Sequence, residues 1–345
     1  MEYRTIEEWC EILDSQRIPI TAKNRIEGPY PYYGANGIQD YVNDYIFDDE
    51  LVLLAEDGGN FGSKDRPIAY RVSGKCWVNN HAHVLKPKND LDVDYLCYSL
   101  MFYNTNGLVN GATRQKLTQS TMRTMKIPCL EINEQQEIVQ RIKKIESILN
   151  DLNGQLELLD ELIKARFVEM FGDPIYNTQN RPMTEFINVV KMQRGYDLPV
   201  QDRNHEGSIP VYGANGVLGY HDVAKINNGG IITGRSGTIG KVYLANKEYW
   251  PLNTSLFSIE TYGNNLIYLQ YLVTLYDLKR FVEGTGVPTL NRNMFHNKKI
   301  IEVPINEQNT FASFVQEIDK SRSRIQKSLE ASQELFDSLM QEYFG

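Results

Sequence analysis

Residues 138–170 read IVQRIKKIESILNDLNGQLELLDELIKARFVEM, and this stretch decides the fold. Apolar residues recur in it at alternating steps of four and three, while Glu, Lys, Asp and Gln fill most other positions. That spacing puts the apolar side chains on one narrow stripe, which a single helix cannot bury. The stripe therefore predicts a partner helix. Arg166 interrupts it before Met170 closes it, and its earlier members are Ile138, Ile142, Ile145, Leu149, Leu152, Leu156, Leu159 and Ile163.

The partner helix is encoded further along the chain, at a constant offset of 173 residues. The two stretches begin alike, with NEQQ at 133–136 and NEQN at 306–309, and each ends in Phe-Gly. The chain is therefore two copies of one plan, a globular part followed by a long helix. The second stripe has polar residues at Arg322 and Ser332, and its apolar members include Phe311, Val315, Ile318, Ile325, Leu329 and Phe336.

The repeat divides the chain into two globular parts, residues 1–130 and 173–305, and two helices, residues 131–172 and 306–345. In the globular parts, glycines break aromatic and β-branched runs, and Asn-Gly pairs between such runs indicate hairpins. Tyr-Gly-Ala-Asn-Gly, for example, occurs twice. We expect a mixed α/β fold: two domains of similar fold joined by two long helices that form an antiparallel coiled coil with pseudo-twofold symmetry.

The composition is that of an ordinary globular protein, with 345 residues, 41% hydrophobic and 23% charged. No apolar run of membrane-spanning length occurs, and the N-terminus lacks the pattern of a signal peptide. Four scattered cysteines without C-x-x-C pairs suggest reduced structural thiols. These features predict a cytoplasmic protein that does not contact a membrane.

The net charge of −8 is unfavourable for binding nucleic acid. The two predicted helices carry −7 of this charge, so the globular parts are nearly neutral. Since DNA binding needs a local basic face rather than a basic chain, the charge alone counts only mildly against it.

Four motifs follow one another along the chain: the repeated Tyr-Gly-Ala-Asn-Gly, the GATRQKL loop at 111–117, the NEQQ before the heptad helix and MFGDP at 170–174. Together they resemble the specificity subunit of Type I restriction–modification enzymes. The resemblance covers essentially the whole chain. It implies that each globular part is a target-recognition domain that reads one half of a bipartite, gapped site in double-stranded DNA. The second copy departs from the pattern at residues 286–288, where Gly-Val-Pro replaces basic and amide side chains, which suggests a different half-site.

The same resemblance implies partners for this chain. The helices would space the two domains and dock modification (methyltransferase) subunits, and a restriction (endonuclease and translocase) subunit would complete the complex. S-adenosylmethionine, ATP and Mg would then be bound by the partner subunits, and no cofactor by this chain.

The residues that could contact DNA are Tyr, Asn, Gln, Arg and Lys side chains in glycine-flanked turns, because these groups suit phosphates or base edges. A plain tight turn or a solvated loop is the competing interpretation. The turn at 235–238 could instead hold a phosphate with its backbone amides. The candidates in the first copy are Tyr33, Asn36, Lys64, Arg66, Arg114, Gln115 and Lys116. Those in the second copy are Arg194, Tyr212, Asn215, Arg235, Ser236, Thr238, Thr289, Asn291 and Arg292.

No motif predicts chemistry carried out by this chain itself. Residues 234–241 imitate a phosphate-binding P-loop, but the spacing of the glycines is wrong. His81 and His83 would share one strand face, yet the sequence places no third ligand, so we expect no metal site. The main alternative is a coiled-coil scaffold with protein-binding globular ends, which would show no salt-sensitive DNA binding. A nuclease or methyltransferase is a third, which would turn over substrate as an isolated chain.

Overall fold

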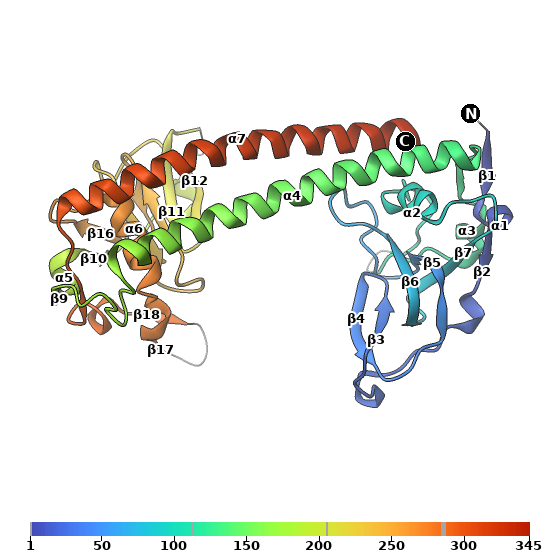
Figure 1. The fold of residues 1–345 in the computed structure, drawn as a ribbon, viewed down its shortest axis with the longest axis horizontal. Helices are drawn as coiled ribbons and strands as arrows, with labels where there is room; N and C mark the ends of the chain where they lie inside the picture. The colour runs from blue at the N-terminus through green and yellow to red at the C-terminus, as the bar shows by residue number, and fades with distance from the viewer. Residues whose placement is uncertain (1, 112–113, 205, 284–287) are drawn as a thin grey trace. The chain divides into compact units, whose positions relative to one another are not determined.

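The computed structural model describes residues 2–111, 114–204, 206–283 and 288–345 (Figure 1). The chain forms two compact units. The first unit contains Met1–Leu152 and Ser328–Gly345, and the second contains Asn153–Lys327. Each unit therefore holds one globular part together with a portion of both long helices, so neither long helix belongs to one unit alone.

The two long helices are α4 (Ile132–Phe171) and α7 (Ile305–Phe344), each 40 residues, or about 60 Å at 1.5 Å per residue. In the first unit, Arg141 Nη1 donates a hydrogen bond to Tyr343 Oη at 3.1 Å. In the second unit, Arg322 Nη2 lies 2.5 Å from Asp160 Oδ1. The beginning of each helix thus meets the end of the other, which is the predicted antiparallel pairing. Neither helix, nor any other described helix, is long and apolar enough to cross a membrane.

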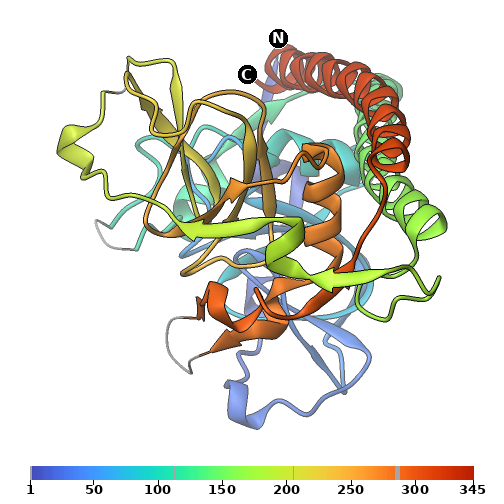
Figure 2. The ribbon, with the colours of Figure 1, turned by 90° about the vertical axis from the view of Figure 1, so that its left-hand side faces the viewer.

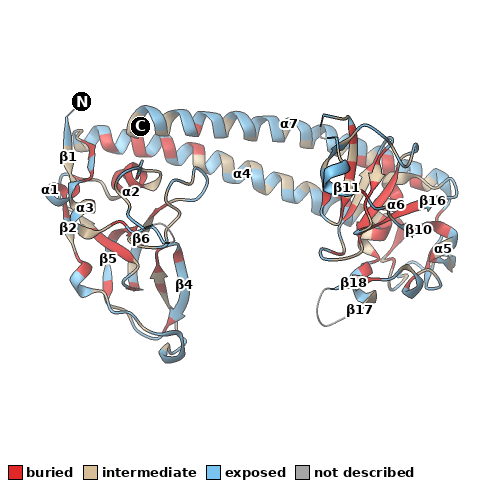
Figure 3. Cartoon of the chain, turned by 180° about the vertical axis from the view of Figure 1, so that it is seen from behind, coloured by how far each residue is buried: buried red, intermediate tan, exposed pale blue. Residues whose placement is uncertain are grey.

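The predicted apolar stripes are most deeply buried where a helix also meets a globular part (Figure 3). Ile138, Ile142 and Ile145 belong to the core of the first unit, which also contains Leu96 and Leu100 of its globular part. The members that are less covered are half-buried, namely Leu149, Leu152, Leu156 and Leu159 in α4 and Ile318, Ile325 and Leu329 in α7. The members buried in the same way as Ile138 are Ile163, Phe311, Val315 and Phe336.

The end of the first stripe differs from the prediction. The heptad pattern continued through Arg166 to Met170, but the fully buried residues after Ile163 are Phe167 and Phe171. Both rings pack against Phe311, with ring centroids 5.3 Å and 5.7 Å away. A straight α-helix drifts relative to a strict heptad, so its buried face moves by one position where it meets a broad aromatic core.

The first globular part is built on a six-stranded sheet, and its pairs are antiparallel except for the parallel pair β3–β6. Helix α2 (Val93–Met101) packs on the sheet, and its buried residues join the core shared with α4. The strands, in sheet order, are β2 (Cys10–Ile12), β7 (Ala82–Pro87), β5 (Phe47–Ala55), β6 (Ala69–Val78), β3 (Tyr30–Gly34) and β4 (Gly37–Val42). Smaller elements are β1 (Tyr3–Thr5), which pairs with β8 (Lys126–Pro128), the helices α1 (Ile6–Trp9) and α3 (Gln119–Thr124), and the 3-10 turns η1 (Asp14–Gln16) and η2 (Ala22–Asn24).

The second globular part repeats this plan, but its strands are divided between a four-stranded and a three-stranded sheet. Helix α6 (Leu266–Leu275), which is orange in Figure 2, packs against β13 and β14. One sheet has the order β10 (Lys191–Arg194), β16 (Ser255–Glu260), β13 (Gly230–Gly234) and β14 (Val242–Ala245); a second has the order β12 (Gly216–His221), β11 (Ile209–Gly213) and β15 (Trp250–Pro251). The remaining elements are the pairs β9 (Met183–Glu185) with β19 (Lys299–Ile301) and β17 (Val282–Glu283) with β18 (Thr289–Leu290), helix α5 (Phe186–Val189), and the turns η3 (Val200–Asp202), η4 (Leu278–Phe281) and η5 (Arg292–Met294). The predicted mixed α/β class with two similar domains is confirmed.

The repeated Asn-Glu-Gln motif fastens each long helix to its own globular part. Gln135 is fully buried; its Oε1 accepts from the backbone N–H of Asp92 at 2.8 Å, and its Nε2 donates to the carbonyls of Asp90 and Leu130. In the second unit, Gln308 Oε1 accepts from the N–H of Asn265 at 2.9 Å, and its Nε2 donates to the Asn264 side chain and to the carbonyl of Val303. Asp92 and Asn265 are the N-caps of α2 and α6. The motif is therefore a structural clamp between helices.

All four cysteines are free thiols. Cys10, Cys76 and Cys97 are buried, and burial raises the pKa of the Cys10 thiol to about 12. A buried neutral thiol behaves as a small apolar side chain, in agreement with the structural role expected for these residues.

Candidate nucleic-acid interface

Three segments of the first unit meet at the end of β5, around Glu56, Asp57 and Gly58. Asn36, in the turn between β3 and β4, donates from Nδ2 to the carbonyl of Gly58 at 3.0 Å. The N–H of Gly58 donates to the carbonyl of Gln115 at 3.1 Å, and the N–H of Leu117 donates to the carbonyl of Glu56 at 2.7 Å. The structure thus brings the candidates Asn36, Arg114, Gln115 and Lys116 together. We call this junction the first hub, defined by residues 36, 56–58 and 114–117.

The basic side chains of the first hub are already partnered. Arg114 Nη2 lies 2.7 Å from Asp57 Oδ1, and Lys116 Nζ lies 3.0 Å from Glu56 Oε1. Their side chains are nevertheless 59% and 49% exposed, so each can still face a ligand. Gly58 has φ +64°, and a Cβ there would lie 3.1 Å from Arg114 Nε. Only glycine therefore lets Arg114 approach this closely without strain.

The other three candidates of the first unit lie elsewhere. Tyr33 is half-buried on β3 beside the apolar core, and burial raises the pKa of its phenol. Lys64 and Arg66 are exposed in the segment between β5 and β6. Lys64 lines a cavity of about 790 Å³ that Phe336 and Met340 of α7 also line. In the described part of the chain, no hydrogen bond or ion pair joins Lys64 or Arg66 to the hub.

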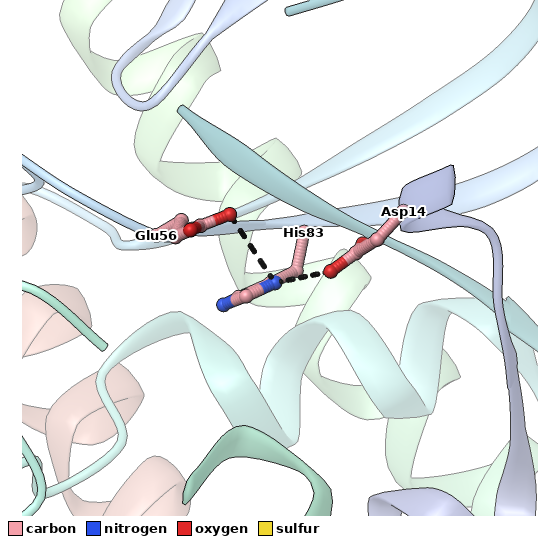
Figure 4. Close-up of side chains that lie close together, drawn as sticks. All are labelled: Asp14, Glu56 and His83. Atoms are coloured by element: carbon pink, nitrogen blue, oxygen red, sulfur yellow. Dashed lines mark hydrogen bonds and ion pairs between the residues drawn. The ribbon is translucent and has the colours of Figure 1, made fainter. Parts of the chain in front are cut away.

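Next to the first hub, and sharing Glu56 with it, lies a polar cluster that we call the buried cluster: Asp14 and His83 are buried, and Arg17, Glu56 and Gln119 are half-buried (Figure 4 shows Asp14, Glu56 and His83). His83 is fully buried on β7; its Nδ1 lies 2.7 Å from Asp14 Oδ2 and 3.7 Å from Glu56 Oε2. Its Nε2 lies 2.9 Å from the carbonyl oxygen of Leu117. Arg17 Nη1 donates to Glu56 Oε2 at 2.7 Å. The cluster therefore joins η1, β5 and β7 to the end of the hub loop.

Both carboxylates of the cluster are held in the ionised form. Burial by itself would raise the pKa of Asp14, but its bonds with His83, Val84 and Gln119 outweigh burial and lower that pKa overall. For Glu56, burial is likewise outweighed, by Arg17 and Lys116 chiefly, and its pKa is lowered. Charge-assisted hydrogen bonds to the anion are the physical cause in both cases.

The ligand atoms of Asp14, Glu56 and His83 lie within 4.8 Å of one another, a spacing that could suit a metal ion. Arg17 and Lys116 already contact these carboxylates, so a cation there would have to displace two positive side chains. The set is better described as an ion network. The sequence had placed His81 and His83 on one strand face, but β7 begins after His81, whose Nδ1 lies 2.6 Å from Asp57 instead.

The second unit repeats the backbone of the first hub. The N–H of Leu290 donates to the carbonyl of Arg235 at 2.8 Å, as Leu117 does to Glu56. Ser236 forms a β-bridge with Thr289, as Asp57 does with Lys116. We call this junction the second hub, defined by residues 215, 235–238 and 288–290.

The side chains at equivalent places carry opposite charges. Arg235 follows β13 as Glu56 follows β5. Counted from the start of the equivalent helices α1 and α5, Arg194 takes the place of Asp14 and Asp197 that of Arg17. Leu256 lies opposite Thr233 in the sheet, as His83 lies opposite Leu54. The second unit therefore has no counterpart of the buried cluster at these positions.

The remaining candidates of the second unit are placed as follows. Asn215 is exposed in the turn between β11 and β12, and Thr238 is exposed after β13. The carbonyl oxygens of Ala214 and Thr238 both lie against Gly234, so the turn between β11 and β12 and the turn after β13 are close to each other. Arg194 is exposed and its Nε lies 3.4 Å from the carbonyl of Asn253.

Three further candidates have structural contacts. Tyr212 is half-buried; its hydroxyl donates to the carbonyl of Leu244 at 3.5 Å, and burial raises its pKa. Asn291 caps η5 by accepting from the N–H of Asn293, and Arg292 is half-buried at the first position of that turn. The predicted departure at 286–288 falls partly outside the described residues, since 286 and 287 are not among them.

Sequence reasoning missed Asp14, Arg17, Glu56 and Asp57. One signal was present: Glu56 and Asp57 directly follow the buried run Leu51–Ala55, and an acidic pair at the end of a buried strand is unusual. The link to Asp14 had no local signal, because these residues meet only through the pairing of β5, β7 and β2.

Comparisons with known proteins agree on one family. The family model described as the type I restriction modification DNA specificity domain matches residues 1–159 and 177–333. The chain is 27% identical to a putative type I restriction enzyme specificity subunit of Haemophilus influenzae, over 95% of this chain and 90% of that protein. It is 22% identical to a putative type I specificity subunit of Mycoplasma pneumoniae, over 84% and 82%.

Solved structures show the same fold. The S subunit of a type I restriction-modification system from M. genitalium matches with a TM-score of 0.62 and 16% identity, over 100% of this chain and 96% of that one. A chain from a type I R-M system, from a study of complex assembly and conformational transition, matches with a TM-score of 0.53 and 12% identity, over 99% and 97%.

Proposed function

Because the chain belongs to the family of the type I restriction modification DNA specificity domain, we propose that its first and second hubs contact the two halves of a split double-stranded DNA site. In this family the specificity subunit is non-catalytic and supplies the recognition of DNA sequence for the restriction–modification complex. The open question at the level of residues is which side chains meet the DNA.

One observation carries the proposal: the same backbone junction occurs in both units and presents different side chains. The first hub exposes Asn36, Arg114, Gln115 and Lys116, and the second exposes or half-exposes Asn215, Arg235, Ser236 and Thr238. Arg and Lys suit guanine O6 and N7, and Asn and Gln suit adenine N6 and N7, in the major groove. Recognition of an asymmetric site requires two junctions that share one backbone arrangement and present different side chains.

The two hubs would contribute differently to affinity. In the first hub each basic side chain faces a carboxylate, so its charge is largely compensated. Among the residues that the structure describes, Arg235 of the second hub forms no ion pair with a carboxylate. Uncompensated cations near phosphates give the salt-dependent part of DNA binding. The second hub is therefore proposed to supply more of the electrostatic attraction.

The chain is proposed to act with partner subunits. Modification subunits would dock on the long helices and bind S-adenosylmethionine, and a restriction subunit would use ATP and Mg. The competing proposal, a scaffold whose globular ends bind proteins, is tested by the same DNA-binding measurement, because it allows no salt-sensitive binding to DNA.

The first step of the test is to map methylated positions in cells with and without this gene, which identifies the site. Binding of the assembled complex is then measured for the intact site and for sites with one half scrambled. We define the discrimination of a half-site as the ratio of these two dissociation constants.

Arg114→Ala should reduce discrimination of the first half-site about 5- to 150-fold, equivalent to about 1–3 kcal/mol, and leave that of the second unchanged, because one bidentate base contact is lost. Arg235→Ala is the matched variant and should reduce discrimination of the second half-site. Its binding to DNA should also depend less on salt concentration than that of the unaltered chain. Equal losses at both half-sites for either variant would contradict the assignment of one half-site to each hub.

A further inference from the structure

The first hub loop is held by two kinds of anchor. The first kind is backbone pairing: Lys116 and Asn110 exchange hydrogen bonds of 2.7 Å and 2.9 Å, and Leu117 bonds to Glu56. The second kind comes from the buried cluster. His83 contacts the carbonyl of Leu117, and Gln119 donates from Nε2 to Asp14 Oδ2 at 2.9 Å. The cluster therefore contacts the chain at Leu117 and Gln119, directly after Lys116 and on both sides of Thr118.

Both ring nitrogens of His83 contact oxygen atoms. Nδ1 faces a carboxylate oxygen of Asp14 at 2.7 Å, and Nε2 faces the carbonyl oxygen of Leu117 at 2.9 Å. Carboxylate and carbonyl oxygens both accept hydrogen bonds from an imidazole N–H. Because the ring is fully buried, these two contacts link the chain at Leu117 to Asp14.

Four charged side chains among the described residues belong to the network around this ring. Asp14 comes from η1, Arg17 from the segment after it, Glu56 from the end of β5 and Lys116 from the hub loop itself. Gln119 of α3 adds a neutral donor to Asp14. Two carboxylates thus face Arg17, Lys116 and the His83 ring in one network, and Lys116 belongs to the first hub itself.

The second unit forms the same backbone junction without this network. Leu290 still bonds to Arg235 through its N–H, although Leu256 stands where His83 would be and Arg194 where Asp14 would be. The junction itself therefore does not need the cluster. What the cluster adds in the first unit is a second attachment, on the carbonyl side of Leu117 and at Gln119.

We propose that Asp14 and His83 are positioning residues for the first half-site: their buried pair fixes the backbone that carries Arg114, Gln115 and Lys116. This inference rests on the proposed function of the first hub. It adds that recognition of one half-site depends on the buried contact between Asp14 and His83, whereas recognition of the other half-site has no such requirement.

The test uses the full chain with His83→Leu, which installs the residue of the second unit, and Asp14→Asn, which keeps the shape and removes the charge. Gln135→Met is the matched control, since it also breaks hydrogen bonds of a fully buried residue in the first unit but touches no residue of the hub. Asp14→Asn remains informative if His83→Leu fails to fold.

Two quantities are measured for each variant. The first is hydrogen exchange of peptides that cover 110–119 and, for comparison, Leu290 in the second unit. The second is the discrimination of each half-site by the complex assembled with modification subunits. We expect exchange at Lys116 and Leu117 to rise about tenfold or more, because a charge-assisted bond restrains the loop. Discrimination of the first half-site should fall about tenfold, with the second half-site and Leu290 unchanged.

Three results would overturn the positioning role: unchanged exchange of the loop, faster exchange with discrimination of the first half-site intact, or the same loss of discrimination in Gln135→Met. The proposed function is judged separately. It fails if Arg114→Ala leaves discrimination of the first half-site unchanged, whatever the exchange of the loop.

Discussion

Glu56 and Arg235 stand at equivalent ends of β5 and β13 and carry opposite charges. The backbone of the two hubs tolerates this inversion because neither side chain takes part in the shared hydrogen bond; only the carbonyl does. The acidic version needs compensation by Arg17 and Lys116, and the compensation ties the hub to the interior. Single residues thus set both the charge and the rigidity of each hub.

The lowered pKa values of Asp14 and Glu56 predict a dependence of stability on acid. A carboxyl whose pKa is lower in the folded than in the unfolded chain stabilises the fold above its unfolded pKa, about 4, and this contribution is lost as the pH falls through the lower folded pKa. The melting temperature of the first unit should therefore decline below about pH 4.

The variant Asp14→Asn should show a shallower decline with acid, and Asp151→Asn, at an exposed position of α4, should follow the unaltered chain. Thermal melts at a series of pH values test this. Parallel curves for Asp14→Asn and the unaltered chain would show that the cluster does not contribute to acid sensitivity.

At the level of elements, the long helices are attached to the globular parts by polar clamps as well as by apolar packing. Gln135 and Gln308 are both nearly inaccessible and each makes three hydrogen bonds across element boundaries. The bonds reach the N-caps of α2 and α6, so each clamp fixes a helix of the globular part relative to a long helix. The repeated Asn-Glu-Gln motif is explained by this geometry.

Gln135→Met should destabilise the first unit by about 2–4 kcal/mol, because it removes the hydrogen bonds to the N–H of Asp92 and to the carbonyls of Asp90 and Leu130. Gln308→Met should destabilise the second unit similarly. Hydrogen exchange in each unit as a function of urea measures both effects. Gln136→Met, at the exposed neighbour, is the control and should change little; a similar loss in that variant would refute the clamp.

At the level of the whole molecule, the internal repeat allows one half to stand in for the other. The first unit uses Phe336, Met340 and Phe344 from the end of α7. Subtracting the repeat offset of 173 gives Ile163, Phe167 and Phe171 at the end of α4, which are also apolar. A second copy of residues 1–172 could therefore cover the core of the first.

Residues 1–172 alone should form a twofold dimer, because a symmetric interface is the simplest way to bury the exposed stripe. With modification subunits, this dimer should methylate a palindromic gapped site, the first half-site repeated in inverted order. Sedimentation and methylation mapping test both statements. A monomer, or a dimer that recognises the original asymmetric site, would rule the idea out.

Residues 173–345 should dimerise less tightly. In the intact chain, Arg322 pairs with Asp160 across the two helices, and the same position in a second copy of α7 would be Gln333. Arg322 would keep only Asp319 of its own helix, at 3.5 Å. A half-buried cation that loses its partner weakens the interface. In the first half, the residue equivalent to Arg322 is Leu149, which carries no charge.

The sequence alone determined the long helices, their pairing and the two-copy plan, because a heptad stripe and a repeat are patterns along one dimension. It also identified the loop at 111–117 and the Tyr-Gly-Ala-Asn-Gly turns, since glycine-flanked motifs are local. Only the tertiary structure decided which side chains of these motifs face the interior. Tyr33 and Tyr212 turned inward, and Arg114 and Lys116 met Asp57 and Glu56. Asp14 and His83, 69 residues apart, met because strand register fixes long-range neighbours, and register depends on the packing of the whole sheet.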